Sequence, residues 1–268
     1  MNTFKAIIIR NWKMNLRNLP VVFIVSRIMS ITYRILGAWL MYYIFFEQQL
    51  AAEFYLATNT DDYMSFVVIG LAFYNLAVGL LMNVSRSLIT EVRENTLTSL
   101  FITPYSKIGY FLGVFTEQVV RLLLEFMIIL LIGALFGAAI FQISIISWLI
   151  GIIIVLVFVG SMTLLLSNLF LHFRDTFMTQ NTLFILMMLI CGVAFPVQFL
   201  PVGLQYLSHI IPLTGALNIF RALVFENATL LEVMPDIWQG LLISILYLVI
   251  GMIFYQKTER KVIGYVFD

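Results

Sequence analysis

Residues 63–85 read YMSFVVIGLAFYNLAVGLLMNVS and contain no charged residue. A helix needs about 20 mostly apolar residues to cross the hydrocarbon layer of a bilayer, so this stretch predicts a membrane-spanning helix. The rest of the chain has the same character. Of its 268 residues, 62% are hydrophobic and only 11% are charged, and the mean hydropathy is +1.03. A soluble domain carries roughly 25% charged residues. We therefore expect an all-α integral membrane protein that forms a single domain over residues 1–268.

Five further stretches have the composition of a span. Residues 126–171 hold no charged residue, but a single helix of that length would measure about 69 Å, over twice the hydrocarbon thickness. A turn must interrupt this run, and the best place for it is near Gln142-Ile143-Ser144. The sequence thus predicts six spans, over residues 20–46, 63–85, 108–138, 145–171, 177–197 and 237–256.

The basic residues predict the orientation of these spans. Eleven of the fifteen fall in the N-terminal segment, in the loops after the second and fourth spans, and in the tail. The opposite loops carry mostly acidic residues. Because cytoplasmic loops are enriched in Lys and Arg, we expect both termini in the cytoplasm of a multi-pass protein of the cell membrane. The eleven are Lys5, Arg10, Lys13, Arg17, Arg86, Arg93, Lys107, Arg174, Lys257, Arg260 and Lys261.

The N-terminal segment, residues 1–19, predicts an interfacial helix that is retained in the mature protein. Phe4, Ile7, Ile8 and Trp12 can share one face, while basic residues on the other reach lipid phosphates, a pattern typical of a helix in the membrane plane. Pro20 then begins the first span. A solvated, frayed tail is the alternative.

Five charged residues lie inside predicted spans: Arg27 and Arg34 in the first, and Glu117, Arg121 and Glu125 in the third. Each set falls near one helix face. Since a charge at mid-bilayer costs at least about 2.5–3.5 kcal/mol, we expect the arginines of the first span to pair with the glutamates of the third, with Arg34 buried. In an alternative, residues 106–125 form an amphipathic lead-in at the surface and Arg27 snorkels to it. A proton relay is a third reading, disfavoured because Arg keeps its proton.

Several kinds of chemistry are excluded by what the chain lacks. The dipeptide Gly-Lys is missing, so no P-loop exists and ATP is not hydrolysed by that route. There is no G-x-S-x-G motif. His172 and His209 are isolated, and Cys191 is the only cysteine, so we expect no metal site and no intrachain disulfide. The net charge of +1 argues against a nucleic-acid partner. Enzymatic chemistry is not expected, which leaves transport or service as a membrane anchor.

Residues 91–104, EVRENTLTSLFITP, form a polar interruption after the second span. Asn95 is a suitable N-cap, and Leu97, Leu100 and Phe101 form an apolar stripe at helical spacing. Pro104 ends this helix or opens the next one. Such a short cytoplasmic helix can rest on the membrane or dock into a groove of a partner protein.

In this region the sequence resembles the permease subunits of type-2 ABC exporters. That family has a Glu-Arg-Glu-x-Gly-Thr run after its second span, followed by a short coupling helix and a Pro. Here Glu91, Arg93, Glu94 and Thr96 match the run if Val92 is allowed between the first two, and Asn95 stands where Gly is usual.

A second family marker precedes the last span. It consists of a Pro, about ten residues, Pro-Leu, and an Arg. Residues 201–221 supply Pro201, Pro212, Leu213 and Arg221, with Gly215 where the family usually has a polar or aromatic residue. The resemblance covers essentially the full length of the chain.

The resemblance implies a half-transporter. Two six-span subunits, identical or paired with a sister permease, would form the pathway, and two separate ATPase subunits would bind ATP and Mg²⁺. Residues 95–103 would be the coupling helix, with ATPase-coupling residues Glu91, Arg93, Glu94, Asn95, Thr96, Leu97, Leu100, Phe101, Thr103 and Pro104. Residues 198–225 would re-enter the outer leaflet as two short helices.

The cargo is not readable from these motifs. The many aromatic residues, with 24 Phe and 12 Tyr, favour an amphipathic or hydrophobic cargo such as a drug, a peptide or a lipid-like molecule. Two rival functions stay open. One is a secondary carrier driven by an ion gradient, although no convincing internal inverted repeat is found. The other is a non-transporting membrane anchor or assembly factor.

Overall fold

The structure is a computed structural model that describes residues 9–10, 13, 21–45, 47, 52–93, 107–173 and 178–267. Within these ranges the regular elements are all helical. The α-helices are α2 (Val21–Leu40), α3 (Ala52–Thr58), α4 (Tyr63–Arg93), α6 (Lys107–Leu135), α7 (Ile145–Phe173), α8 (Met178–Ile190), α9 (Val202–Ile210), α10 (Pro212–Phe225) and α11 (Met234–Phe267). A π-helical segment, Met41–Phe45, continues α2, and 3₁₀ turns lie at Ile140–Gln142 and Val197–Phe199.

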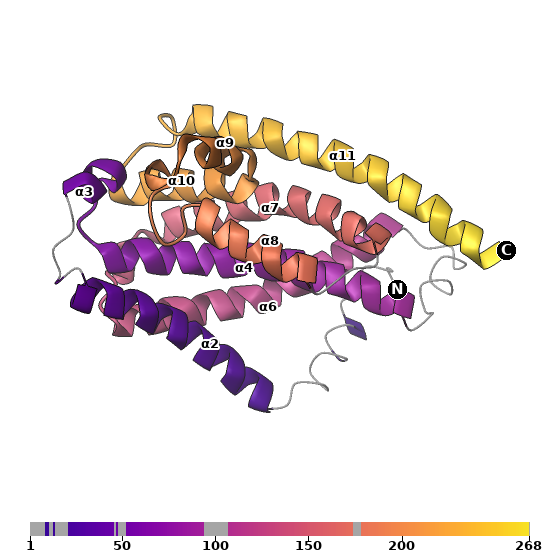
Figure 1. Ribbon diagram of the computed structural model, residues 1–268, viewed down its shortest axis with the longest axis horizontal. Helices are drawn as coiled ribbons and strands as arrows, with labels where there is room; N and C mark the ends of the chain where they lie inside the picture. The colour runs from indigo at the N-terminus through magenta and orange to yellow at the C-terminus, as the bar shows by residue number, and fades with distance from the viewer. Residues whose placement is uncertain are drawn as a thin grey trace.

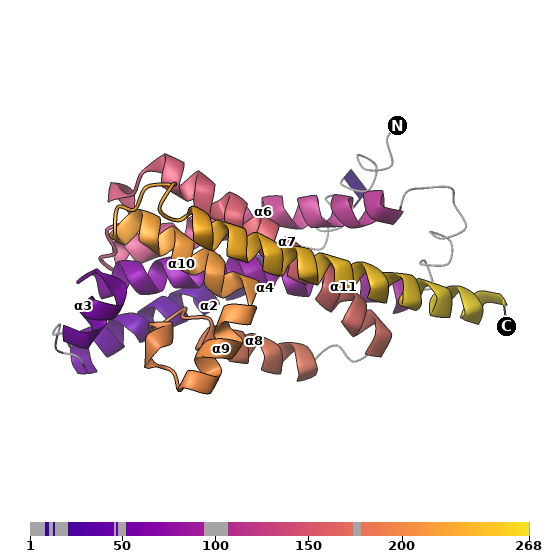
Figure 2. The same cartoon turned by 90° about the horizontal axis from the view of Figure 1, so that it is seen from above.

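Helix α4 is the centre of the bundle. It packs against α6 on one side and α7 on another, and α7 in turn contacts α10 and α11. The long helices run roughly along one axis, and the connection from α10 to α11 lies at the same end as α3 (Figures 1 and 2). The apolar stretch of α4 is buried completely, whereas that of α11 is only 17% buried. The outer helices therefore present apolar surfaces that suit lipid, and α4 forms the interior.

An aromatic cluster joins α4 to three other helices, α6, α7 and α10. The ring of Phe73 lies 5.2 Å from that of Phe126 on α6, 4.7 Å from that of Phe220 on α10, and 6.1 Å from that of Trp148 on α7. Gly79 allows α4 and α6 to approach closely, since a Cβ there would meet the side chain of Leu122. Large rings and small residues together give the close packing of a membrane-helix interior.

The predicted break in the long uncharged run is present. Helix α6 ends at Leu135 and α7 begins at Ile145. Gly137 in this connection has a φ of +96°, a conformation that other residues rarely adopt. Ser144 caps α7, because its Oγ accepts a hydrogen bond from the Ile146 N–H at 3.3 Å. The turn thus spans residues 136–144, starting a few residues before the predicted position.

The predicted count of six spans is not confirmed. Among the described residues, four helical segments are long and apolar enough to cross a membrane: Tyr63–Ser87, Gly109–Leu135, Ile145–Leu169 and Met234–Phe254. Helices α9 and α10, bent by 91°, would make a fifth span if they counted as one. The segment predicted at 20–46 is helical from Val21 to Phe45 but is not in this set.

The helix predicted over 177–197 is shorter in the structure. Helix α8 has 13 residues, a length of about 20 Å against a hydrocarbon layer of about 30 Å. Its end has a local cause, since Gly192 takes a φ of +71° and turns the chain. At the other extreme, α11 continues well past the predicted end at residue 256, up to Phe267.

Some predicted features lie outside the described residues. The interfacial helix over 1–19 is described only at 9–10 and 13, and the coupling segment 94–106, from Glu94 through Pro104, is not described. Glu91 and Arg93 close α4, although their side chains are not described. The two short helices expected within 198–225 are present as α9 and α10. Pro201 stands before α9, and Pro212 is the first residue of α10.

Candidate functional site

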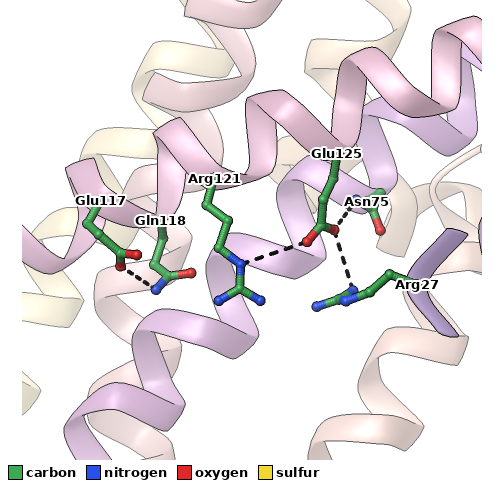
Figure 3. Close-up of polar contacts among 6 residues, drawn as sticks. All are labelled: Arg27, Asn75, Glu117, Gln118, Arg121 and Glu125. Atoms are coloured by element: carbon green, nitrogen blue, oxygen red, sulfur yellow. Dashed lines mark hydrogen bonds and ion pairs between the residues drawn. The ribbon is translucent and has the colours of Figure 1, made fainter. Parts of the chain in front are cut away.

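A polar cluster inside the helical bundle gathers side chains from α2, α4 and α6 (Figure 3). On α6, Glu117, Arg121 and Glu125 are spaced by four residues and therefore follow one side of the helix. All three lie in the apolar segment Gly109–Leu135. A charge within such a segment needs a partner or water, so the contacts of these residues define what the cluster can do.

Glu125 is the centre of the cluster. Its carboxylate lies 3.5 Å from Arg27 Nη1 on α2 and 3.9 Å from Arg121 Nε on its own helix. Asn75 Nδ2 on α4 donates a hydrogen bond to the same carboxylate at 3.2 Å. The side chain of Glu125 is only 12% exposed, whereas that of Arg27 is 35% exposed. The carboxylate thus faces the protein, and Arg27 reaches it from the edge of the bundle.

This cluster provides an ion pair between α2 and the rest of the bundle, from Arg27 to Glu125. Of the described α2 side chains, only Ile31 and Ile35 are buried hydrophobics. A carboxylate that accepts a hydrogen bond and faces two guanidinium groups is well compensated, and removing it would leave charges without a partner. The arrangement can therefore hold α2 against α4 and α6, and a change in these contacts would release the helix.

Glu117 and Gln118 form a second, deeper part of the site. Both side chains are buried, and Gln118 Nε2 donates a hydrogen bond to Glu117 Oε2 at 2.5 Å. The burial of Glu117 favours a position facing protein over the alternative in which residues 106–125 rest on the membrane surface.

Arg34 does not lie where the sequence suggested. It is exposed on α2, and no ion pair or hydrogen bond joins it to another residue in the described part of the chain. The expectation that Arg34 is buried and paired within the chain is therefore wrong. The reason is the register of α2 on α6. Arg27 contacts Glu125 and, farther along, Trp39 contacts Phe136 at 6.4 Å between rings. Arg34 thus lies beside the part of α6 after Glu125, where no acidic residue exists.

Arg221 forms a second polar site, in which its partners are backbone carbonyls and an aromatic ring. Its Nη1 donates to the carbonyl of Gly192 at 2.6 Å, and its Nη2 donates to the carbonyls of Phe66 and Val193, each at 3.1 Å. The guanidinium carbon lies 3.5 Å from the centroid of the Phe66 ring, a cation–π geometry. Arg221 is buried, and it ties α10 to α4 and to the turn after α8.

Sequence reasoning missed three residues that build these sites. Asn75 was overlooked because it carries no charge, although an amide within an apolar span is a readable signal. Gly70 lets the Gly192–Val193 turn approach α4, since a Cβ on Gly70 would meet the Val193 carbonyl oxygen and the Arg221 guanidinium. Gly192 supplies both the turn and an acceptor for Arg221. The roles of the two glycines depend on contacts between distant segments, which the local sequence does not reveal.

The described residues contain no group of three or more His, Cys, Asp or Glu side chains that could hold a metal ion. His209 is exposed on α9, and the thiol of Cys191 is buried.

Comparison with known proteins gives one finding. The family model described as "ABC-2 type transporter" matches residues 2–225. A search of curated proteins finds no match for the chain. The family match includes the polar cluster, Arg221 and both segments that carry the motifs quoted above.

Proposed function

The chain belongs to the ABC-2 type transporter family, and we propose that it is the substrate-pathway subunit of an exporter driven by separate ATPase subunits. The observation that carries this proposal is the family match over residues 2–225. The chain is a multi-pass membrane protein and a membrane subunit of an ABC transporter. Export, a dimeric pathway, two ATPase partners, cytoplasmic termini, a plasma-membrane location and an amphipathic or hydrophobic cargo are the proposed refinements.

We expect the energy for export to come from a partner, because the sequence holds no P-loop. ATP and Mg²⁺ would be bound by that partner and not by this chain. The contact would be made by residues 95–103, with Leu97, Leu100 and Phe101 on the docking face. This segment directly follows α4, so movement at the partner's surface would reach α4 first.

The geometry of α4 supports such transmission. It is one α-helix of 31 residues, about 47 Å long, and longer than the hydrocarbon layer. Its apolar stretch is wholly buried, and it holds Phe73 of the aromatic cluster, Asn75 of the polar cluster and Phe66 beside Arg221. A displacement of its end would therefore act on the packed interior and on the contacts that hold α2.

Two conformations of the pathway are required by this mechanism. ATP bound by the partners can change their populations only if the closed ATPase pair binds one conformation more tightly than the other. We propose that residues 95–103 make the contact with the ATPase pair whose strength differs between the two conformations. The α2–α4–α6 cluster, in which Glu125 is shared by three polar side chains, is a place where two sets of contacts can alternate.

The test is ATP hydrolysis by a complex that is purified with its ATPase. Phe101→Asp puts a charge on the docking face and should reduce stimulation of the ATPase by the membrane subunit at least about tenfold, because a charge buried at an interface is strongly unfavourable. The matched control is Ser99→Asp, which adds the same charge on the opposite side of the predicted helix and should leave stimulation within about twofold. Both variants must retain the wild-type melting temperature.

The rival functions have different outcomes in the same preparation. A secondary carrier would move cargo in liposomes with an ion gradient and without nucleotide. A membrane anchor would bind partners without changing the rate of ATP hydrolysis. Equal stimulation by the wild type, Phe101→Asp and Ser99→Asp would refute the coupling assignment.

A further inference from the structure

Helix α2 carries an exposed polar face in the middle of an apolar segment. Ser30, Arg34 and Gly37 are exposed and lie at spacings of four and three residues, so they share one side of the helix. A Cβ on Gly37 would meet nothing within 4 Å. By contrast, the polar group of Thr32, on another side, is satisfied by a hydrogen bond to the Ile28 carbonyl at 2.9 Å. The face that contains Arg34 is thus exposed, and it has room for a further group at Gly37.

Within the part of the chain that the structure describes, no carboxylate forms an ion pair with Arg34. Its recorded electrostatic neighbour is Tyr74 on α4, whose hydroxyl is neutral and donates to the Phe184 carbonyl at 2.8 Å. Neither residues 63–85 of α4 nor residues 126–171 of α6 and α7 include an acidic residue, and α8 has none. The nearest carboxylate in register, that of Glu125, already faces Arg27 and Arg121.

The surroundings of Arg34 are apolar. The side chains of Met29, Tyr33 and Leu40 on α2, and of Met41 in the π-helical segment that continues it, are all exposed. A molecule that satisfies this surface needs a negative group for the guanidinium and an apolar part for the flanking side chains. This combination describes an anionic amphiphile, because an uncompensated charge within a span is costly and a guanidinium binds carboxylate or phosphate with several hydrogen bonds.

Pairing of two copies would strengthen the need for an anion. In a two-fold interface the same patch of both subunits meets itself, so an α2 face at the axis would bring two Arg34 side chains together. Like charges repel, and an anionic guest between them would remove the repulsion. This step rests on the proposed function, in which two membrane subunits form the pathway.

We propose that the face of α2 formed by Ser30, Arg34 and Gly37 is the cargo-binding surface of the pathway, and that it binds the anionic headgroup of an amphiphilic cargo. The guanidinium of Arg34 binds the headgroup, the Ser30 hydroxyl hydrogen-bonds to it, Gly37 provides the space, and the apolar tail lies along the exposed α2 side chains.

The experiment is photolabelling of the purified full-length chain in nanodiscs made of phosphatidylcholine. The probes are a diazirine-bearing dodecanoic acid and the corresponding dodecanol, and labelled α2 peptides are quantified by mass spectrometry. The acid should label α2 about tenfold more than the alcohol, as expected for one charge-assisted contact in an apolar setting. Arg34→Gln should lower labelling by the acid to the level of the alcohol, and Arg34→Lys should retain most of it.

Thr32→Ala is the matched control, since it removes a polar group from another side of the same helix and should leave labelling unchanged. Equal labelling by acid and alcohol, or undiminished labelling of a folded Arg34→Gln variant, would overturn the proposal. Competition by phosphatidylglycerol as strong as that by unlabelled dodecanoate would also overturn it, because the occupant would then be a bilayer lipid. The assay contains no ATPase, so its failure is distinct from loss of ATPase coupling.

Discussion

Arg221 and Arg34 are two arginines within apolar helices, and their surroundings are opposite. Arg221 is buried, and its guanidinium donates to three backbone carbonyls and lies over an aromatic ring. Arg34 is exposed on α2, and no carboxylate or carbonyl of the described chain binds it. The first arginine is a structural element of a packed interior. The second carries a charge that the fold leaves for another molecule. Residue type alone does not distinguish the two roles, whereas the contacts do.

The largest expected difference is between removing the charge of Arg221 and removing that of Arg34. Arg221→Met should lower the free energy of unfolding by about 3 kcal/mol, because it leaves buried carbonyls without donors. Arg34→Met should change it by no more than about 0.5 kcal/mol, as is usual for exposed positions. Denaturant unfolding in mixed micelles, followed by tryptophan fluorescence, gives both values. Equal destabilisation by the two variants would remove the distinction between the arginines.

A pair of glycines sharpens the same comparison. Gly70→Ala places a Cβ against the Val193 carbonyl and the Arg221 guanidinium and should destabilise by about 1–3 kcal/mol through overpacking. Gly37→Ala on α2 adds the same group where nothing lies within 4 Å and should be neutral or stabilising by up to about 1 kcal/mol. The melting temperatures of the two variants provide the check. A Gly70→Ala variant as stable as the wild type would contradict the close contact between α4 and the turn.

A smaller destabilisation than at Arg221 is expected at the ion pair that holds α2. Glu125→Gln keeps an acceptor for Asn75 but removes the charge facing Arg27, and should cost about 1–2 kcal/mol, since Arg27 is partly exposed to solvent or lipid. In a double-mutant cycle with Arg27→Gln, the two losses should overlap by about 0.5–1 kcal/mol. Thr32→Ala combined with Glu125→Gln is the additive control. Strict additivity of Arg27→Gln and Glu125→Gln would mean that the pair contributes nothing to stability.

The sequence was informative where a physical signal is local. Long apolar runs predicted the positions of α4, α6 and α7, and the length of the charge-free run 126–171 required the turn that the structure has at Gly137. The two short helices within 198–225 were implied by the family resemblance, and Pro201 and Pro212 suit the places where α9 and α10 begin. For the apolar runs and the turn, the composition of one segment determines its own structure.

The sequence was less informative where the outcome depends on register or on a distant contact. Helix α8 ends early because Gly192 turns the chain, and nothing near Gly192 indicates that its carbonyl binds Arg221. Predicting whether Arg34 has a partner required the register of α2 against α6. Contacts such as Arg27 with Glu125 and Trp39 with Phe136 set this register. A heptad spacing places two arginines on one face of a helix, but only the packing decides that one of them has a carboxylate partner.

The central claim is that ATP bound by a partner changes cargo binding at the α2 face formed by Ser30, Arg34 and Gly37. Residues 95–103 transmit this change from the partner. The most direct measurement is photolabelling of α2 by the dodecanoic acid probe in the complex with its ATPase, with and without nucleotide trapped by vanadate. We predict that trapping changes labelling at least about fivefold, because the nucleotide-bound ATPase pair must bind one conformation of the membrane subunit more tightly than the other. We also predict that Phe101→Asp abolishes this response. Labelling that is identical with and without trapped nucleotide would contradict the account.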